Sequence, residues 1–182
     1  MSEVIIFLAG SAGILAVSWR ALGVPRAHGR WRFLAFECLL ALVLFQAPCW
    51  FIRPLAPHQL LSWALLAASA LLALHGFDLL RRLGRPNAAH GRSSDFGFER
   101  TSVLVTSGAY RWVRHPLYAS GVFGAWGAFF KCPSRTGAAL AAAASLLSTA
   151  TARAEEDENV EKFGIAYAEY VRRTWRFIPF VF

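Results

Sequence analysis

Charged residues are scarce in this sequence, and their scarcity indicates the class of protein. Of its 182 residues, 16% are Asp, Glu, Lys or Arg, whereas 56% are hydrophobic. A soluble domain of this length does not need uncharged apolar runs as long as those found here, so the composition predicts an integral membrane protein. The length predicts a single domain that occupies residues 1–182.

Cysteine is also rare, and its three positions exclude the disulfide framework of a small secreted domain. Cys38 and Cys49 fall in an apolar run and Cys132 lies in a short polar segment, which favours small apolar residues or free thiols. The five histidines are scattered without ligand spacing, so no metal site is predicted. Phosphate-binding glycine loops, dinucleotide-binding glycine motifs and the serine-hydrolase motif are absent as well.

Acidic residues are fewer than basic ones, which gives a net charge of +8. The basic residues lie between apolar runs and form no single stripe, so nucleic acid is not a predicted partner. Arginine far outnumbers lysine and alanine is abundant, a bias that predicts a bacterial source with GC-rich coding. The first residues, Met-Ser-Glu, lack the positive flank of a signal peptide, so the first apolar run is predicted to be a retained helix.

Five apolar runs are long enough, or nearly so, to cross a bilayer as helices. They are residues 4–19, 33–52, 59–77, 116–130 and 136–152. The sequence thus predicts an all-α integral membrane fold with about five transmembrane helices, in which residues 1–80 hold the first three. The last two runs are separated by five residues and form a tight hairpin, for which a re-entrant hairpin is the alternative.

The distribution of basic residues between the runs predicts the orientation. With the N-terminus outside, 16 of the 19 Lys and Arg residues lie on the cytoplasmic side. This predicts a protein of the bacterial cytoplasmic (inner) membrane, in contact with the lipid bilayer, whose functional face is cytoplasmic. Small residues repeat every four positions, as at Ser120, Gly124 and Ala128, which predicts that the two hairpin helices are the most closely packed pair.

Residues 108–118 concentrate two arginines, a histidine and three aromatic residues beside an apolar run. Pro116 suits the first position of a helix and disfavours a helical conformation at His115. His115 is therefore expected beside free backbone N–H groups at a helix start, where a carboxylate binds well. Two alternatives remain: Arg114 and His115 anchor the helix at lipid phosphates, and Tyr110, Trp112 and Tyr118 form an interfacial aromatic belt.

A second polar cluster, Glu155 and Glu156, follows the fifth apolar run. The spacing of the residues after it predicts an amphipathic cytoplasmic helix from residue 153 to about residue 172. Glu156 falls on the apolar face of this helix and Glu155 about 100° away, so Glu156 is the preferred inward ligand. A ligand that carries a carboxylate and an ammonium group would fit between His115 and these acids. A solvated helix face is the alternative for the acidic cluster.

Residues 104–118 and 154–179 together resemble the isoprenylcysteine carboxyl methyltransferase and phospholipid methyltransferase superfamily of integral membrane methyltransferases. The first block contains Arg114-His115-Pro116-Leu117-Tyr118, and the second contains Glu155-Glu156, Phe163-Gly164, Tyr167, Tyr170 and Arg173. The resemblance covers residues 104–179 as a cofactor-binding catalytic core. The first hundred residues match only in being hydrophobic spans.

The resemblance implies an enzyme that transfers a methyl group from S-adenosylmethionine to a hydrophobic or lipid-like acceptor, with O-methylation of an isoprenylcysteine-type carboxylate as the implied reaction. It implies that Arg173 holds the substrate. The residues implied in cofactor binding are Tyr110, Arg114, His115, Pro116, Tyr118, Glu155 and Glu156. The sequence departs from the family pattern at Ser120, where glycine is common, and at Ile165 and Ala166, where carboxyl-methylating members often have acidic residues. Two other functions remain open: a membrane NADPH reductase of the sterol-reductase type, and a non-catalytic membrane scaffold.

Overall fold

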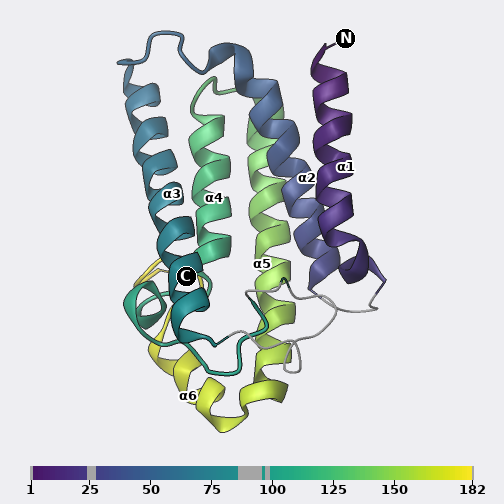
Figure 1. Ribbon diagram of the computed structural model, residues 1–182. Coiled ribbons are helices and arrows are strands. Elements are labelled where there is room, and N and C mark those ends of the chain that lie inside the picture. Colours follow the sequence, from purple (N-terminus) through teal and green to yellow (C-terminus); the bar gives the residue numbers. More distant parts are fainter. Residues whose placement is uncertain (1, 24–27, 86–95, 97–98, 182) are drawn as a thin grey trace.

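The computed structural model describes residues 2–23, 28–85, 96 and 99–181, and within them the chain is largely helical. Figure 1 shows the long helices side by side along one axis, with the short α6 at one end. Among the described residues, strand-like pairing is limited to one isolated bridge between Val113 and Trp175. The elements are α1 (Ser2–Leu22), α2 (Gly29–Gln46), the 3-10 helix η1 (Ala47–Cys49), α3 (Pro57–Leu83), the 3-10 helix η4 (Gly108–Arg111), α4 (Pro116–Phe129), α5 (Arg135–Phe163) and α6 (Ile165–Arg173). The predicted all-α fold is confirmed.

In the part of the chain that the structure describes, three segments are long and apolar enough to cross a bilayer: Glu3–Leu22, Gly29–Cys49 and Pro57–Leu83. Large apolar side chains on their outer faces are exposed, such as Leu71 at 69% and Leu74 at 70%. Such faces are unfavourable in water, at about 25 cal/mol per Å², and suit hydrocarbon. α4 has 14 residues, which at about 1.5 Å each fall short of a roughly 30 Å hydrocarbon core. The count of five transmembrane helices therefore stays a prediction.

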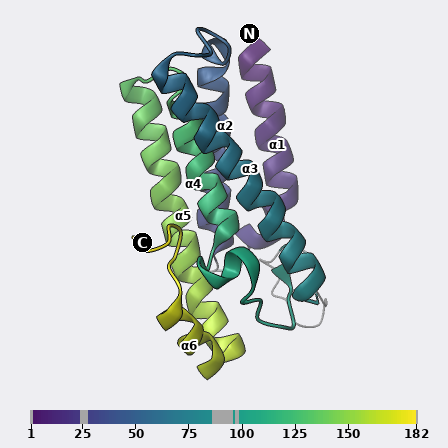
Figure 2. The same ribbon diagram turned by 90° about the vertical axis from the view of Figure 1, so that its left-hand side faces the viewer.

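The two ends of the bundle hold different elements. One end, the site end, collects the ends of α1 and α3, the starts of α2 and α4, and α6 (Figure 1). The opposite, far end holds the N-terminus, η1 and the turn between α4 and α5. Figure 2 shows that α5 reaches the site end of the bundle, where it meets α6.

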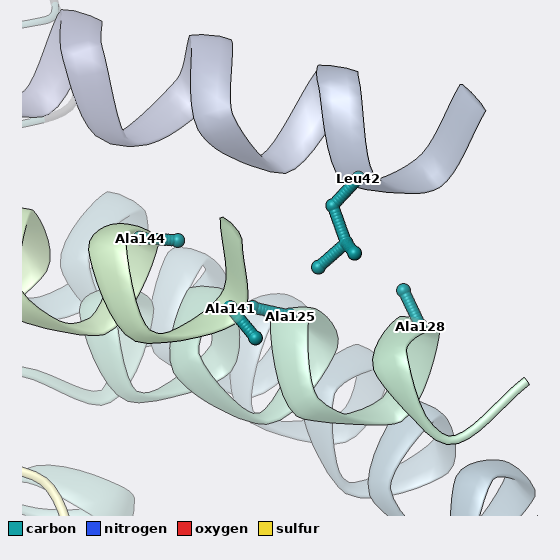
Figure 3. Packing of buried hydrophobic residues seen from close by; sticks show 5 residues of the cluster. All are labelled: Leu42, Ala125, Ala128, Ala141 and Ala144. Atoms are coloured by element: carbon teal, nitrogen blue, oxygen red, sulfur yellow. The ribbon is translucent and has the colours of Figure 1, made fainter. Parts of the chain in front are cut away.

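The core is built from small residues that let helices approach closely. Leu42 of α2 packs against Ala125 and Ala128 of α4 and against Ala141 and Ala144 of α5 (Figure 3). The predicted hairpin of α4 and α5 is present, but the expectation that these two helices are the most closely packed pair is wrong. α4 packs more extensively on α3, and α5 on α2, than α4 and α5 pack on each other.

Two glycines of α4, Gly124 and Gly127, explain this difference, because they face α3. A Cβ at Gly127 would lie 2.9 Å from Leu66 Cγ, and one at Gly124 would lie 3.1 Å from Ser69 Oγ. Both neighbours belong to α3. The repeat of small residues therefore packs on more than one neighbour: Gly124 faces α3, whereas Ala128 packs in the core that α4 shares with α2 and α5.

Two predicted helix boundaries are also wrong. α2 ends at Gln46, well before residue 52, because Pro48 cannot supply the backbone N–H that a continuing α-helix needs. The predicted separate helix from residue 153 does not exist, since α5 runs unbroken to Phe163. The break comes at Gly164, whose φ of +58° is a left-handed conformation that favours glycine. α6 is therefore a short separate helix.

Candidate functional site

The segment that contains residues 108–118 lies at the site end and is held by backbone pairing with the chain after α6. Arg114 N donates to Trp175 O at 2.8 Å, and Trp175 N donates to Trp112 O at 3.0 Å. The turn before it requires Gly108, which has a φ of +59° and where a Cβ would lie 2.7 Å from His75 Nε2. The two halves of the predicted core therefore meet in space.

The start of α4 has the local geometry that the sequence predicts. Pro116 is the first helical residue, and His115 precedes it with non-helical dihedrals of φ −125° and ψ 63°. The His115 side chain is buried, at 5% exposure, and its ring stacks on Tyr118 with centroids 5.6 Å apart. The restriction that proline imposes on the preceding residue thus places the imidazole at the helix start.

Glu156 is the centre of a buried ion-pair network. Its carboxylate accepts from Arg114 Nε at 2.9 Å and from Arg176 Nη2 at 2.8 Å, and His115 Nε2 lies 3.3 Å from Oε1. Burial alone would raise the pKa of this carboxyl, but the hydrogen bonds from His115 and Arg176 and the charge beside them hold its pKa well below the usual range. Glu156 is therefore negatively charged and already surrounded by donors.

Arg114 is fixed from two sides, because it also donates through Nη1 to the carbonyl of Val171 at 3.3 Å and to the carbonyl of Thr174. Its side chain is 9% exposed. These bonds satisfy the last turn of α6, where backbone carbonyls have no partner within the helix. Arg114 thus joins the start of α4 to α5, through Glu156, and to the end of α6.

A pocket opens beside this network, between α3, η4, α4, α5 and α6. Glu155 lines it, with Oε2 at 3.9 Å from His115 Nδ1, whereas Glu156 does not. Apolar walls come from residues such as Leu80 and Phe163. The other polar or aromatic lining residues are Glu99, Thr101, Tyr110, Arg114, His115, Tyr118, Asn159, Tyr167 and Tyr170. A pocket with carboxylates and aromatic rings suits a ligand that carries positive charge and a flat apolar ring.

Three tyrosines that line this pocket, Tyr110, Tyr167 and Tyr170, stay neutral. Burial raises the pKa of Tyr110, and the charge of Glu155 raises it further. Burial likewise raises the pKa of Tyr167 and of Tyr170. Tyr170 Oη donates to the carbonyl of Tyr110 at 2.6 Å, which closes one wall of the pocket. These phenols therefore act as hydrogen-bond donors and ring surfaces, and not as bases.

The structure brings together most of the residues that the sequence predicts. Tyr110, Arg114, His115, Tyr118 and Glu155 line one pocket. Pro116 is buried at the start of α4 next to it. Glu156 lies directly behind Arg114 and His115, so Glu155 and not Glu156 is the acid that faces the pocket.

Arg173, predicted as the substrate-holding residue, lies apart from this pocket. Its side chain is exposed and lines a second cavity of about 560 Å³ with Arg111, Trp112 and Trp175. Tyr170 lines both cavities and is the wall between them. From this part of the chain, the arginine that joins Arg114 in pairing with Glu156 is Arg176.

Sequence reasoning missed three further contributors. Arg176 lies in the chain after α6, and it pairs with Glu156 across 20 positions, which no sequence pattern indicates. Arg32 is almost fully buried and donates to Glu99 Oε2 at 2.6 Å, which fixes a lining residue of the pocket. His28 Nδ1 lies 3.0 Å from Glu158 Oε2 and joins the start of α2 to the end of α5. A charged residue buried at a helix start leaves no periodic signal in a sequence.

Comparison with known proteins supports the region found by geometry. The family model described as Phospholipid methyltransferase matches residues 58–164, more than half of the chain. The match includes α3, η4, α4 and α5, which supply most of the pocket wall, and both Glu155 and Glu156. No curated protein and no solved structure matches the chain.

Proposed function

Because this chain belongs to the phospholipid methyltransferase family, a family of membrane methyltransferases, we propose that it transfers a methyl group from S-adenosylmethionine to a lipid-like acceptor at its site end. One observation carries the proposal: the family match covers the start of α4 and the end of α5, which bring Glu155 and His115 into one pocket. The Arg-rich loops support a site end that faces the cytoplasm of a bacterial cell.

The residues of the pocket fit this cofactor. Glu155 is the one acid of the pair that faces the cavity, and it would bind the ammonium group of the methionine part. Arg114 and His115, beside the free N–H groups of the α4 start, would bind its carboxylate. Tyr110 and Tyr118 offer ring faces to a sulfonium or an adenine. When bound, the cofactor supplies an activated methyl group.

The chain itself mainly positions and desolvates the reacting groups, since transfer from an activated donor needs no strong base. Glu156 does not line the pocket and contacts both Arg114 and His115, so we assign it the role of a positioning residue that holds these two side chains. Pro116 fixes the direction of α4 at this point. Arg173 would hold an anionic group of the acceptor in the second cavity, beyond Tyr170.

Two kinds of methyl acceptor, a carboxylate oxygen and an amine nitrogen, are each supported by a different observation. The sequence resemblance favours a carboxylate oxygen, as in an isoprenylcysteine, and the matched family model favours a phospholipid amine. A labelled-methyl assay against lipid extract separates them. A methyl ester releases its label as methanol in base, whereas an N-methyl group retains it. Label in neither lipid class would contradict a lipid-like acceptor.

Cofactor binding is tested by calorimetry with S-adenosylmethionine and with its demethylated product. We expect both to bind the purified protein and His115→Ala to weaken binding about tenfold, because a partner of the carboxylate is lost. Glu3→Gln, exposed in α1 near the N-terminus, is the matched control and should bind as the unchanged protein does. A melting temperature that rises with NADPH but not with S-adenosylmethionine would favour a reductase. The absence of binding to either compound would favour a scaffold.

A further inference from the structure

The far end of the bundle contains a pair of cysteines that the proposed function does not use. Cys49 is the last residue of η1, and Cys132 lies in the turn between α4 and α5. Figure 1 shows the connection between α2 and α3 at the same end as the α4–α5 turn, opposite α6. Two cysteines distant in sequence therefore belong to neighbouring loops.

Two buried glutamines hold these loops together. Gln59 Nε2 donates to the carbonyl of Cys49 and to the carbonyl of Lys131, each at 3.1 Å. Gln46 Nε2 donates to the carbonyl of Cys132 at 2.8 Å. Because the single amide nitrogen of Gln59 binds both loops, the backbone segments that carry the two cysteines are adjacent and fixed.

The two cysteine side chains lie near each other on these neighbouring loops, close enough for the thiols to interact, and both are half-buried. Beside them Lys131 is buried at 1% exposure, with Nζ 3.1 Å from Gln59 Oε1 and 3.0 Å from the centroid of the Trp63 ring. A closed packing of this kind leaves the thiols few orientations.

The third cysteine is a built-in control. Cys38 lies in α2, eight residues before its end at Gln46, or about 12 Å along the helix axis. Its side chain packs against the alanine core around Leu42. Distance and packing both separate Cys38 from the pair.

We propose that Cys49 and Cys132 are a disulfide-forming pair that fastens η1 to the α4–α5 turn when the far end meets an oxidising solution. The chemistry is thiol–disulfide exchange with a small or protein disulfide as oxidant. One thiolate attacks the external disulfide and releases one thiol, and the second thiolate then displaces the other. The pair loses two electrons and two protons, and the oxidant becomes two thiols.

The proposal is independent of the methyl transfer, because no residue of the pair lines either site cavity. It also carries information on orientation. Disulfides persist in extracytoplasmic compartments and are rare in the cytosol. A disulfide formed in the cell would therefore place the far end outside and the site end inside.

The test uses the full chain, purified in detergent, reduced, and then incubated with oxidised glutathione. We expect an intact mass that is lower by two hydrogen atoms, one maleimide-reactive thiol in place of three, and one cross-linked peptide that contains Cys49 and Cys132. Cys38→Ser should form the same bond and leave no reactive thiol. The melting temperature of the oxidised protein should exceed that of the reduced protein.

Three outcomes would overturn the proposal. They are glutathione adducts on Cys49 and Cys132 without a bond between them, three thiols that all remain reactive, and a cross-link that includes Cys38. Cys49→Ser should retain a reactive Cys132 or a glutathione adduct there, and a bond between Cys38 and Cys132 in this variant would also count against the pair. Cofactor binding, measured in parallel, separates failure of this proposal from failure of the proposed function.

Discussion

The two ends of the helical bundle bury polar groups in contrasting ways. At the far end, a side-chain amide donates to backbone carbonyls and accepts from one lysine, and this amide, Gln59, is completely buried. At the site end, a carboxylate binds two arginines and a histidine, and a second carboxylate, Glu155, faces a pocket. The far end uses its polar groups to join loops. The site end keeps one charged group available, which is what separates a binding site from a structural network.

Removal of Glu156 should give the largest effect in the molecule. Glu156→Ala leaves Arg114, Arg176 and His115 without their shared anion, and loss of one partner of a buried ion pair costs about 3 kcal/mol or more. We expect a lower free energy of unfolding and loss of cofactor binding together. Chemical unfolding and calorimetry measure the two. Full stability in this variant would mean that the network does not hold the site end.

Acid should weaken the same network. The pKa of Glu156 lies below its ordinary value of 4.5, so its contribution to stability is fully present above that pH and is lost as the pH falls toward the lower, folded-state pKa. We expect the free energy of unfolding to fall below about pH 4.5, and to fall less steeply in Glu156→Gln. Equal slopes in the two proteins would assign the acid sensitivity to other carboxyls.

Removal of the far-end amide should affect stability alone. Gln59→Ala deprives the Lys131 ammonium and three carbonyls of a partner, which should lower the free energy of unfolding by about 2 kcal/mol. Cofactor affinity should stay the same, because Gln59 lies at the end opposite the pocket. A loss of affinity without a loss of stability would show that the two ends are coupled.

The smallest stability effect, and a clear binding effect, is expected at Glu155. Its side chain is 27% exposed and has no strong ion pair, since His115 Nδ1 lies 3.9 Å away. Glu155→Gln should weaken S-adenosylmethionine binding about tenfold, or about 1.4 kcal/mol, while the unfolding midpoint stays close to that of the unchanged protein. If Glu155→Gln instead destabilises the protein and leaves binding intact, then the two acids have each other's roles.

The features that sequence predicted are those with local causes. Proline acts on its immediate neighbour, so the helix start at Pro116 and the conformation of His115 followed from two adjacent residues. The dense polar segment at residues 108–118 also marked the pocket correctly. The acidic cluster after the fifth apolar run was also predicted as the partner of His115, but helix spacing favoured Glu156, whereas Glu155 lines the pocket.

The features that sequence missed depend on where chains separated in sequence meet. Arg173 and Arg176 are three residues apart, and a continued helix would place both on one side. α6 ends at Arg173, however, and the extended Thr174 turns the following chain so that Arg176 points to Glu156. The pair of Arg32 and Glu99 is joined across 67 positions. Side-chain pairing over such separations leaves no periodic signal.

α5 contains the fifth apolar run that the sequence predicts to cross the bilayer, and its unbroken length fixes the distance between the far end and the acidic pair. From Arg135 to Glu155 the helix rises about 30 Å, close to the thickness of the hydrocarbon core. The same rod fixes the rotational phase of the acidic pair, because each added residue turns the remainder of the helix by about 100°. One residue inserted before Glu155 would therefore both shift the acidic pair by about 1.5 Å along the helix axis and move each acid to another side of the helix.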